Sequence, residues 1–283
     1  MKTTTKFILS AVASSFLALA AYAQANISGK VFVAEVNGAV SYVVGGKVVK
    51  LEKGASLAVE GAHIETAAGS SLVLVYSNGT SIYIDENTIV DIRRFLQRPF
   101  TPGVDTTALE PSASDTLARV SQGRVVVSTN ELATGTSMVY QTPDSQVRIR
   151  GREVVIEVQN ESTNVVLVAG DVTVTPVNAP PGDIGQALHT GETAVITANS
   201  ASTTAAASVQ IVQTNQDLTN ALAPIVASTE RAQSTVVFQS VTTPAGSGTG
   251  TDTATTVIQA QAVVPAAMPV QLTVSPSTLR TGS

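Results

Sequence analysis

Short runs of valine, isoleucine and leucine alternate with polar residues along most of the chain, and glycine or asparagine separates the runs. Clear examples are "KVFVAEVNGAV" from Lys30, "SSLVLVYSNGTSIYID" from Ser70 and "NVVLVAGDVTVTPV" from Asn164. A period of two places alternate side chains on one face of a strand, and β-branched residues favour strands. The pattern therefore predicts an all-β fold between residues 30 and 200.

The clearest turn signal is Asn78-Gly79, which separates two alternating segments. Asparagine and glycine tolerate the positive φ angles of a type I′ turn, and such turns join the strands of tight hairpins. We therefore expect a β-hairpin centred on these two residues, with both in that conformation.

A short pattern recurs along the chain. "NGAV" from Asn37, "QGRV" from Gln122 and "AGDV" from Ala169 each place a glycine two residues before a strand-opening valine. Glycine permits a tight turn, and the β-branched residue that follows packs well on a pleated surface. The recurrence indicates a coiled or sandwiched β architecture.

Changes in composition mark the limits of the folded region. "RPFTPGVDTTALEPSASD" from Arg98 contains three prolines and has little periodicity. Residues 98–116 are therefore expected to form an excursion between two β-rich halves. Beyond residue 200, runs of alanine, serine, threonine and glycine predict a low-complexity tail over residues 201–283.

One segment of the tail has helical periodicity. Its apolar residues share one stripe, and they are Ile211, Leu218, Leu222 and Ile225. We therefore expect a short helix near residues 209–233, in spite of Pro224.

The first residues have the layout of a secretory signal. Lys2 and Lys6 form a positive region, "FILSAVASSFLALA" is apolar, and "AYA" before Gln24 supplies the small residues of a cleavage site. The apolar run is shorter than the ~20 residues that a membrane-spanning helix needs. We expect a signal peptide over residues 1–23 and an exported mature chain without a transmembrane segment, in the periplasm or at the cell surface. The alternative is an uncleaved N-terminal anchor.

The composition excludes several classes of function. The formal net charge is −5, whereas a protein that binds the nucleic-acid backbone needs a basic face. The chain has no cysteine, which removes disulfides, thiolate nucleophiles and cysteine metal sites. His63 and His189 are the only histidines, and neither a "G-x-S-x-G" elbow nor a phosphate-binding loop occurs. We expect no enzyme activity, no catalytic or metal-binding residues, no cofactor and no nucleic-acid partner.

Several motifs follow one another in a recognisable order. The first set contains two leucines, two glycines, an isoleucine and a threonine, which are Leu51, Gly54, Leu57, Gly61, Ile64 and Thr66. The later motifs are "IYIDENT" from Ile82, "VSQGRV" from Val120, Thr142-Pro143, Arg150-Gly151-Arg152 and "LVAGDVTV" from Leu167. This order is similar to that of the FecR domain family, periplasmic modules first known from ferric-citrate-type signal transducers. The family has Arg-Gly-Thr where this chain has Arg-Gly-Arg.

The resemblance covers residues 30–198 and implies a β-solenoid-like or sandwich-like FecR domain over residues 30–200. It implies structural roles for the motif residues, which are Gly54, Gly61, Thr66, Asn78, Gly79, Thr142, Pro143, Gly151 and Gly170. We expect neither a cytoplasmic anti-sigma segment nor a membrane helix before the domain. The resemblance therefore implies an extracytoplasmic binding or signalling surface rather than a complete transmembrane regulator.

Arg148, Arg150 and Arg152 occupy alternate positions in "VRIRGREVV". Alternate residues of a strand share a face at a repeat of about 6.6 Å, so the row can bind carboxylates or phosphates bidentately. The alternative is a solvated strand face in which the arginines pair with Glu153, Glu157 or Asp144. A second basic group extends the row if the two β-rich halves pack together, and it consists of Arg93, Arg94 and Arg98.

Two classes of function fit these observations. The first is a non-enzymatic exported FecR-domain protein that binds an envelope protein or an anionic glycan and takes part in extracytoplasmic signalling. The alternative is a structural surface or matrix protein, in which the flexible tail links or embeds the β-rich module. Reversing the arginines separates the two, because it abolishes binding under the first hypothesis and leaves assembly intact under the second.

Overall fold

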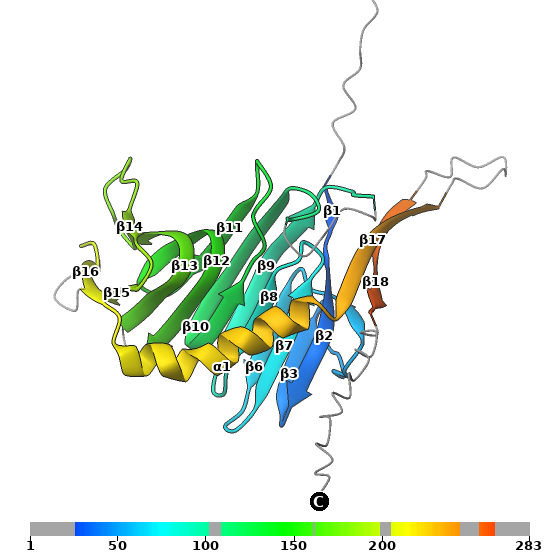
Figure 1. The fold of residues 1–283 in the computed structure, drawn as a ribbon, viewed down its shortest axis with the longest axis horizontal. Coiled ribbons are helices and arrows are strands. Elements are labelled where there is room, and N and C mark those ends of the chain that lie inside the picture. The colour runs from blue at the N-terminus through cyan, green and yellow to red at the C-terminus, as the bar shows by residue number, and fades with distance from the viewer. Residues whose placement is uncertain (1–25, 102–108, 161, 199–204, 244–254, 264–283) are drawn as a thin grey trace, which may run out of the picture.

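A computed structural model describes residues 26–101, 109–160, 162–198, 205–243 and 255–263 (Figure 1). The predicted signal peptide lies outside these residues, as do part of the excursion and parts of the tail. Most of the described residues lie in β-strands, so the all-β fold expected from the alternating pattern is confirmed. Among the described residues, no helix combines the length and hydropathy needed to cross a bilayer.

The main sheet is one continuous set of paired strands that folds back on itself around a single core. The sheet thereby forms two layers that face each other across the core, which we name layer 1 and layer 2. Layer 1 contains β2 (Lys30–Asn37), β5 (Ser56–Ala58), β7 (Ser71–Tyr76), β8 (Ser81–Ile84), β15 (Glu192–Thr197) and β16 (Ser208–Gln213). Layer 2 contains β3 (Val40–Val44), β4 (Lys47–Val48), β6 (Ala62–Thr66), β9 (Ile89–Gln97), β11 (Ser137–Gln141) and β14 (Gln186–Leu188). The short β1 (Ile27–Ser28) pairs with β9.

Three long strands belong to both layers: β10 (Ser114–Ser128), β12 (Ser145–Gln159) and β13 (Ser162–Pro176). The first part of β10 pairs with β9 and β11, and its last part pairs with β8 and β12. Shifts in register accompany these bends, since an inserted residue kinks a strand and increases its local twist.

Two glycines of the recurring pattern lie where strands approach each other closely. Gly123 has φ +84°, and a Cβ there would lie 2.2 Å from the Oγ1 of Thr88. Gly170 has φ +97°, and a Cβ there would lie 2.1 Å from the carbonyl oxygen of Gly151 in β12. Only glycine has both the positive φ and the missing side chain that these positions require. The pattern seen in the sequence therefore marks points of close backbone approach.

The inward faces of the two layers form the core. Aliphatic residues fill most of it, and its largest fully buried side chains include Tyr42, Tyr76, Tyr140 and Phe95. The rings of Tyr76 and Phe95 meet edge to face, with centroids 4.8 Å apart. The hydroxyl of Tyr42 donates a hydrogen bond to the carbonyl of Ala58 at 2.6 Å, which satisfies one polar group inside the core.

Part of the outer face of layer 1 is also buried, because the tail covers it. Figure 1 shows α1 (Gln216–Gln233) crossing the strands of this layer, followed by the hairpin of β17 (Val236–Thr243) and β18 (Thr255–Ala262). Leu222 and Val226 of α1 pack against a cluster of outward-facing valines, which are Val126, Val155 and Val166. The strands of layer 1 that lie beneath the tail are thus apolar on both faces, as in sheets that are covered on both sides.

The helix is fixed to the sheet by polar contacts as well. The Oγ of Ser81 donates to the carbonyl of Thr229 at 2.8 Å, and the amide of Gln233 donates to the carbonyls of Gly79 and Ser128 at 2.9 Å each. Ile211, which the helical stripe included, lies instead in β16, because Asn215 caps the helix through a bond from the amide of Asp217. The sequence places the end of the β domain at residue 200, whereas β16 continues the sheet beyond it.

The turn at Asn78-Gly79 differs from the expected type. The hairpin of β7 and β8 is present, but Gly79, with φ +86°, is the only residue of its loop with a positive φ angle. Gly79 donates to the carbonyl of Tyr76 at 2.9 Å, and Tyr76 donates to the carbonyl of Thr80 at 2.7 Å. These bonds define a longer loop with glycine at its left-handed position, which needs no positive φ at Asn78.

Candidate functional site

Arg148 and Arg150 are exposed neighbours on the outer face of layer 2, while the intervening Ile149 is 1% exposed and faces the core. Among the described residues, neither arginine has a carboxylate within ion-pair distance. Glu157, which the sequence offered as a partner, instead pairs with Arg124 at 2.8 Å. The outward-facing Asp171 on the adjacent β13 makes no ion pair with either arginine. Both guanidinium groups are therefore available to a ligand.

Arg152 does not continue this pair. The register between β12 and β13 shifts between Ile149 and Arg152, where β12 crosses from layer 2 into layer 1. Arg152 pairs with Gly170, and its carbonyl accepts a hydrogen bond from the amide of Thr129 at 2.7 Å. The row of three arginines expected from their spacing is thus a row of two, because the strand bends at Gly151.

A cleft of about 470 Å³ lies beside the two arginines. We name it the arginine cleft, and it is lined by Leu132, Ala133, Gly135, Thr136, Ser137, Met138, Arg148, Ile149 and Arg150. One wall is the loop that precedes β11, and the other is β12, which pairs with β11. The cleft thus combines two guanidinium groups with the hydroxyl of Ser137, a set of donors suited to an oxyanion.

The loop wall of the arginine cleft is held by Glu110, which is 6% exposed. Its carboxylate accepts hydrogen bonds from the amide of Ala133 at 2.8 Å, from the hydroxyl of Ser114 at 2.6 Å and from the hydroxyl of Thr136. It also accepts one from the side-chain amide of Asn78 at 3.2 Å. Burial raises the pKa of Glu110, while these hydrogen bonds act in the opposite direction.

The sequence did not single out Glu110, because it lies within the segment expected to be an excursion. The available signal was its isolation, since it is the only charged residue between Asp105 and Asp115. A single carboxylate in an otherwise uncharged run is a candidate for a buried anchor, because such groups stay buried only when they are hydrogen-bonded.

Other arginines share the outer face of layer 2. Strand order places β9, β10, β11 and β12 side by side, so Arg94 of β9 lies three strand spacings, roughly 14 Å, from Arg148. Arg94 pairs with Asp115 at 2.7 Å. Arg119 of β10 lies between them and borders a second cleft of about 440 Å³ with Gln141 and Gln146. The sequence missed Arg119 because only the pairing of distant strands brings it to this face.

His63 lies between two carboxylates on the same face. Its Nδ1 is 2.6 Å from the Oδ1 of Asp91, and its Nε2 is 2.8 Å from the Oε1 of Glu65. These hydrogen bonds raise the pKa of His63 above its ordinary value of 6.5, because the protonated ring donates to both carboxylates.

We expect His63→Gln to destabilise the protein at low pH only. Since the folded pKa of His63 is raised, its stabilisation is fully present below about pH 6.5 and is lost as pH rises through the folded pKa. The groups are partly exposed, so the effect is small. Urea unfolding of both proteins at pH 5.5 and pH 9 measures it, and an equal difference in the free energy of unfolding at both pH values contradicts this role.

The remaining motif residues build turns. The Oγ1 of Thr66 donates to the carbonyl of Asp85 at 2.5 Å and accepts from the amide of Thr88 at 3.0 Å, which holds the turn after β8. The Oγ1 of Thr142 accepts from the amide of Ser145 at 3.0 Å across the turn that contains Pro143. The glycines at two further turns have positive φ angles, and they are Gly54 and Gly61.

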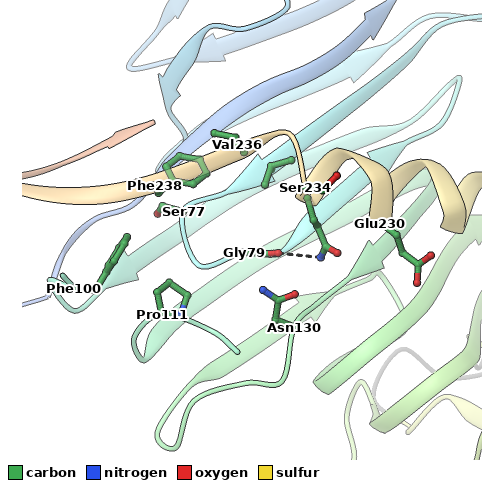
Figure 2. A pocket seen from close by; sticks show the side chains of 11 residues that line it. Ser77, Gly79, Phe100, Pro111, Asn130, Glu230, Ser234, Val236 and Phe238 are labelled. Carbon is green, nitrogen blue, oxygen red and sulfur yellow. Dashed lines mark hydrogen bonds between the residues drawn. The ribbon is translucent and has the colours of Figure 1, made fainter. Parts of the chain in front are cut away.

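A smaller cavity of about 100 Å³ lies on the other side of the molecule, under the end of α1 (Figure 2). Phe100, Pro111, Val236 and Phe238 supply apolar walls, and the bond from Gln233 to Gly79 closes one side. Ligand pockets usually measure about 300–1,000 Å³. We therefore assign this cavity to the packing of α1 and β17 on layer 1.

Comparison with known proteins identifies the domain. Residues 62–173 match the family model FecR, described as FecR protein. The chain carries a FecR domain. The match begins at the first residue of β6 and ends within β13, so this FecR domain includes both Glu110 and the arginine cleft. No curated protein matches the chain.

Two solved structures are similar to part of the chain, and both are of a proposed anti-sigma factor from Parabacteroides distasonis ATCC 8503. Their identities to this chain are 12% and 13%, each with a TM-score of 0.40. The likeness covers 57% and 56% of this chain and 63% and 64% of those chains. The chain therefore spans less than two thirds of the length of these structures.

Proposed function

We propose that this FecR-domain protein is an exported, non-enzymatic module that takes part in signalling at the cell envelope by binding a carboxylate-bearing glycan in the arginine cleft. The FecR match supports a regulatory role. The layout of residues 1–23 supports export. The observation that carries the binding proposal is the pair of exposed, unpaired guanidinium groups of Arg148 and Arg150 beside a cleft.

Arginine suits this role better than lysine. A guanidinium group is planar, always charged and able to donate two parallel hydrogen bonds to one carboxylate. Two such groups at positions i and i+2 of a strand are about 6.6 Å apart, so they can bind two carboxylates of one polymer. Arg119 and its cleft extend the same face toward β14, which favours an extended ligand.

The double replacement Arg148→Ser plus Arg150→Ser tests the proposal. We expect the mature protein to bind polygalacturonate, and we expect the variant to bind it at least ten-fold more weakly, because a hydrogen bond to a charged group contributes about 1.5–3 kcal/mol. Isothermal titration calorimetry at low and at physiological salt measures both values. Uncharged dextran controls for interactions that do not involve carboxylates.

The matched control is Lys47→Ser plus Lys53→Ser, which removes the same charge from two exposed positions far from the arginine cleft. This control is expected to bind as the unaltered protein does. The proposal fails if polygalacturonate does not bind, or if both double variants weaken binding equally. An acidic protein that binds in place of the glycan, and loses binding in the arginine variant, would reassign the ligand and keep the site.

The alternative function, a structural surface or matrix protein, is favoured by one observation, the exposed and uncharged edge of β16. Under that alternative, assembly through this edge continues when Arg148 and Arg150 are replaced. The same purified variant therefore separates the two functions, if its binding and its state of assembly are both measured.

A further inference from the structure

The strand β16 (Ser208–Gln213) is one end of the main path of paired strands. It pairs with β15 on one side, and no described strand pairs with its other side. Figure 1 shows it at the end of the molecule opposite to β17 and β18. Its outer backbone amides and carbonyls form a row that is open to pairing with another strand.

Among the described residues, this edge lacks the features that normally prevent pairing. Proteins protect edge strands with lysine, proline, a bulge or a covering segment. The sequence of β16 is "SVQIVQ", its pairing with β15 has no register shift, and no charged residue occurs between Glu192 and Asp217. Ile211 and Val212 remain 37% and 38% exposed. Short, uncharged, β-prone segments of this kind associate readily.

The opposite end of the same path is protected. It is formed by β5, and the segment before β5 carries three lysines, which are Lys47, Lys50 and Lys53. All three side chains are exposed. Charges at this end oppose the approach of another sheet edge, whereas β16 itself carries no charged residue. Within this path, the difference between the two ends restricts pairing to the β16 edge.

We propose that β16 pairs with β16 of a second copy of this chain, antiparallel and about a two-fold axis. Pairing of β16 with its own copy gives a closed dimer rather than a filament, because a two-fold contact uses the same surface on both copies. The absence of charge on the edge favours a second copy, since no like charges face each other at the axis. Gln210 lies on the outer face of layer 1 and can form side-chain hydrogen bonds across the axis.

Pairing two six-residue strands buries a small area, so we expect a dissociation constant on the order of 10 µM. Sedimentation equilibrium of the mature protein at concentrations from about 1 to about 200 µM measures this dissociation constant, because the range includes the expected value. The variant Gln210→Lys plus Val212→Lys is expected to raise the dissociation constant at least ten-fold. Both side chains are exposed, so the folded monomer is expected to be retained. The control Val48→Lys, at a residue that is 78% exposed near the protected end, is expected to dimerise normally.

Hydrogen exchange of the unaltered protein provides a second readout that does not depend on the folding of any variant. Amides of residues 208–213 are expected to exchange more slowly at high protein concentration than at low concentration. A monomer throughout the range, a dimer that the lysine variant leaves unchanged, or exchange in β16 that is independent of concentration would each overturn the proposal. None of these outcomes depends on the arginine cleft, so the proposed function is tested separately.

Discussion

Replacing Gly170 by alanine is expected to lower the free energy of unfolding by roughly 4 kcal/mol, which is close to the largest effect of a single substitution. The new Cβ would lie 2.1 Å from the carbonyl oxygen of Gly151 and 2.6 Å from the amide nitrogen of Arg152. Both atoms belong to the backbone of β12, which is paired on both sides and cannot move without breaking hydrogen bonds. The positive φ angle of Gly170 adds about 1–2 kcal/mol of strain. Urea unfolding followed by far-UV circular dichroism measures the change.

The matched control is Gly191→Ala. Gly191 also has a positive φ angle, +84°, but a Cβ there would meet no atom within 4 Å. Its cost is therefore limited to backbone strain of about 1–2 kcal/mol. An equal loss of unfolding free energy in the two variants would contradict the claim that β13 approaches the backbone of β12 closely at the bend.

Replacing Glu110 by alanine is expected to lower the free energy of unfolding by about 3 kcal/mol and to weaken binding in the arginine cleft. The change leaves several donors without an acceptor, including the part-buried amide of Ala133 and the buried hydroxyl of Ser114. Each unsatisfied buried donor costs about 1–3 kcal/mol. Binding falls although Arg148 and Arg150 are unchanged, because the loop wall that faces them is no longer fixed. Thermal unfolding and calorimetry with polygalacturonate measure the two effects.

Glu131→Ala is the matched control, because Glu131 is an exposed carboxylate in the same region of the fold. Its replacement is expected to change stability by less than about 0.5 kcal/mol, as for most surface substitutions. A Glu110→Ala variant that is as stable as this control, and that binds as the unaltered protein does, contradicts the role of Glu110 as the anchor of the loop.

The alternation of apolar and polar residues was enough to predict the strands, because the period of two is a local property of each segment. It did not predict the two layers, since these depend on which distant strands pair. Continuous apolar runs such as Val125–Val127 indicate that another element covers the second face of the sheet, because a strand that is apolar on both faces is buried on both. That cover is α1, which the sequence placed in a low-complexity tail.

The candidate site was likewise predicted only in part, where its geometry depends on one local segment. The spacing of Arg148 and Arg150 predicts that they share a face, since they lie on one regular segment of β12. The same spacing wrongly predicts that Arg152 shares this face. The strand bends at Gly151, where Gly170 of another strand packs closely against it, and no local pattern shows this contact. Glu110 and Arg119 approach the site only through long-range pairing. Local patterns therefore identify single strands, and long-range packing decides which side chains meet.

Hydrogen exchange of the mature protein with and without saturating polygalacturonate tests the assignment of the binding face most directly. Slower exchange is predicted in the loop over residues 132–136 and in the amides around Arg148 and Arg150, with no change in α1. Protection that appears only at α1 and β17, or no protection at saturation, would contradict the account.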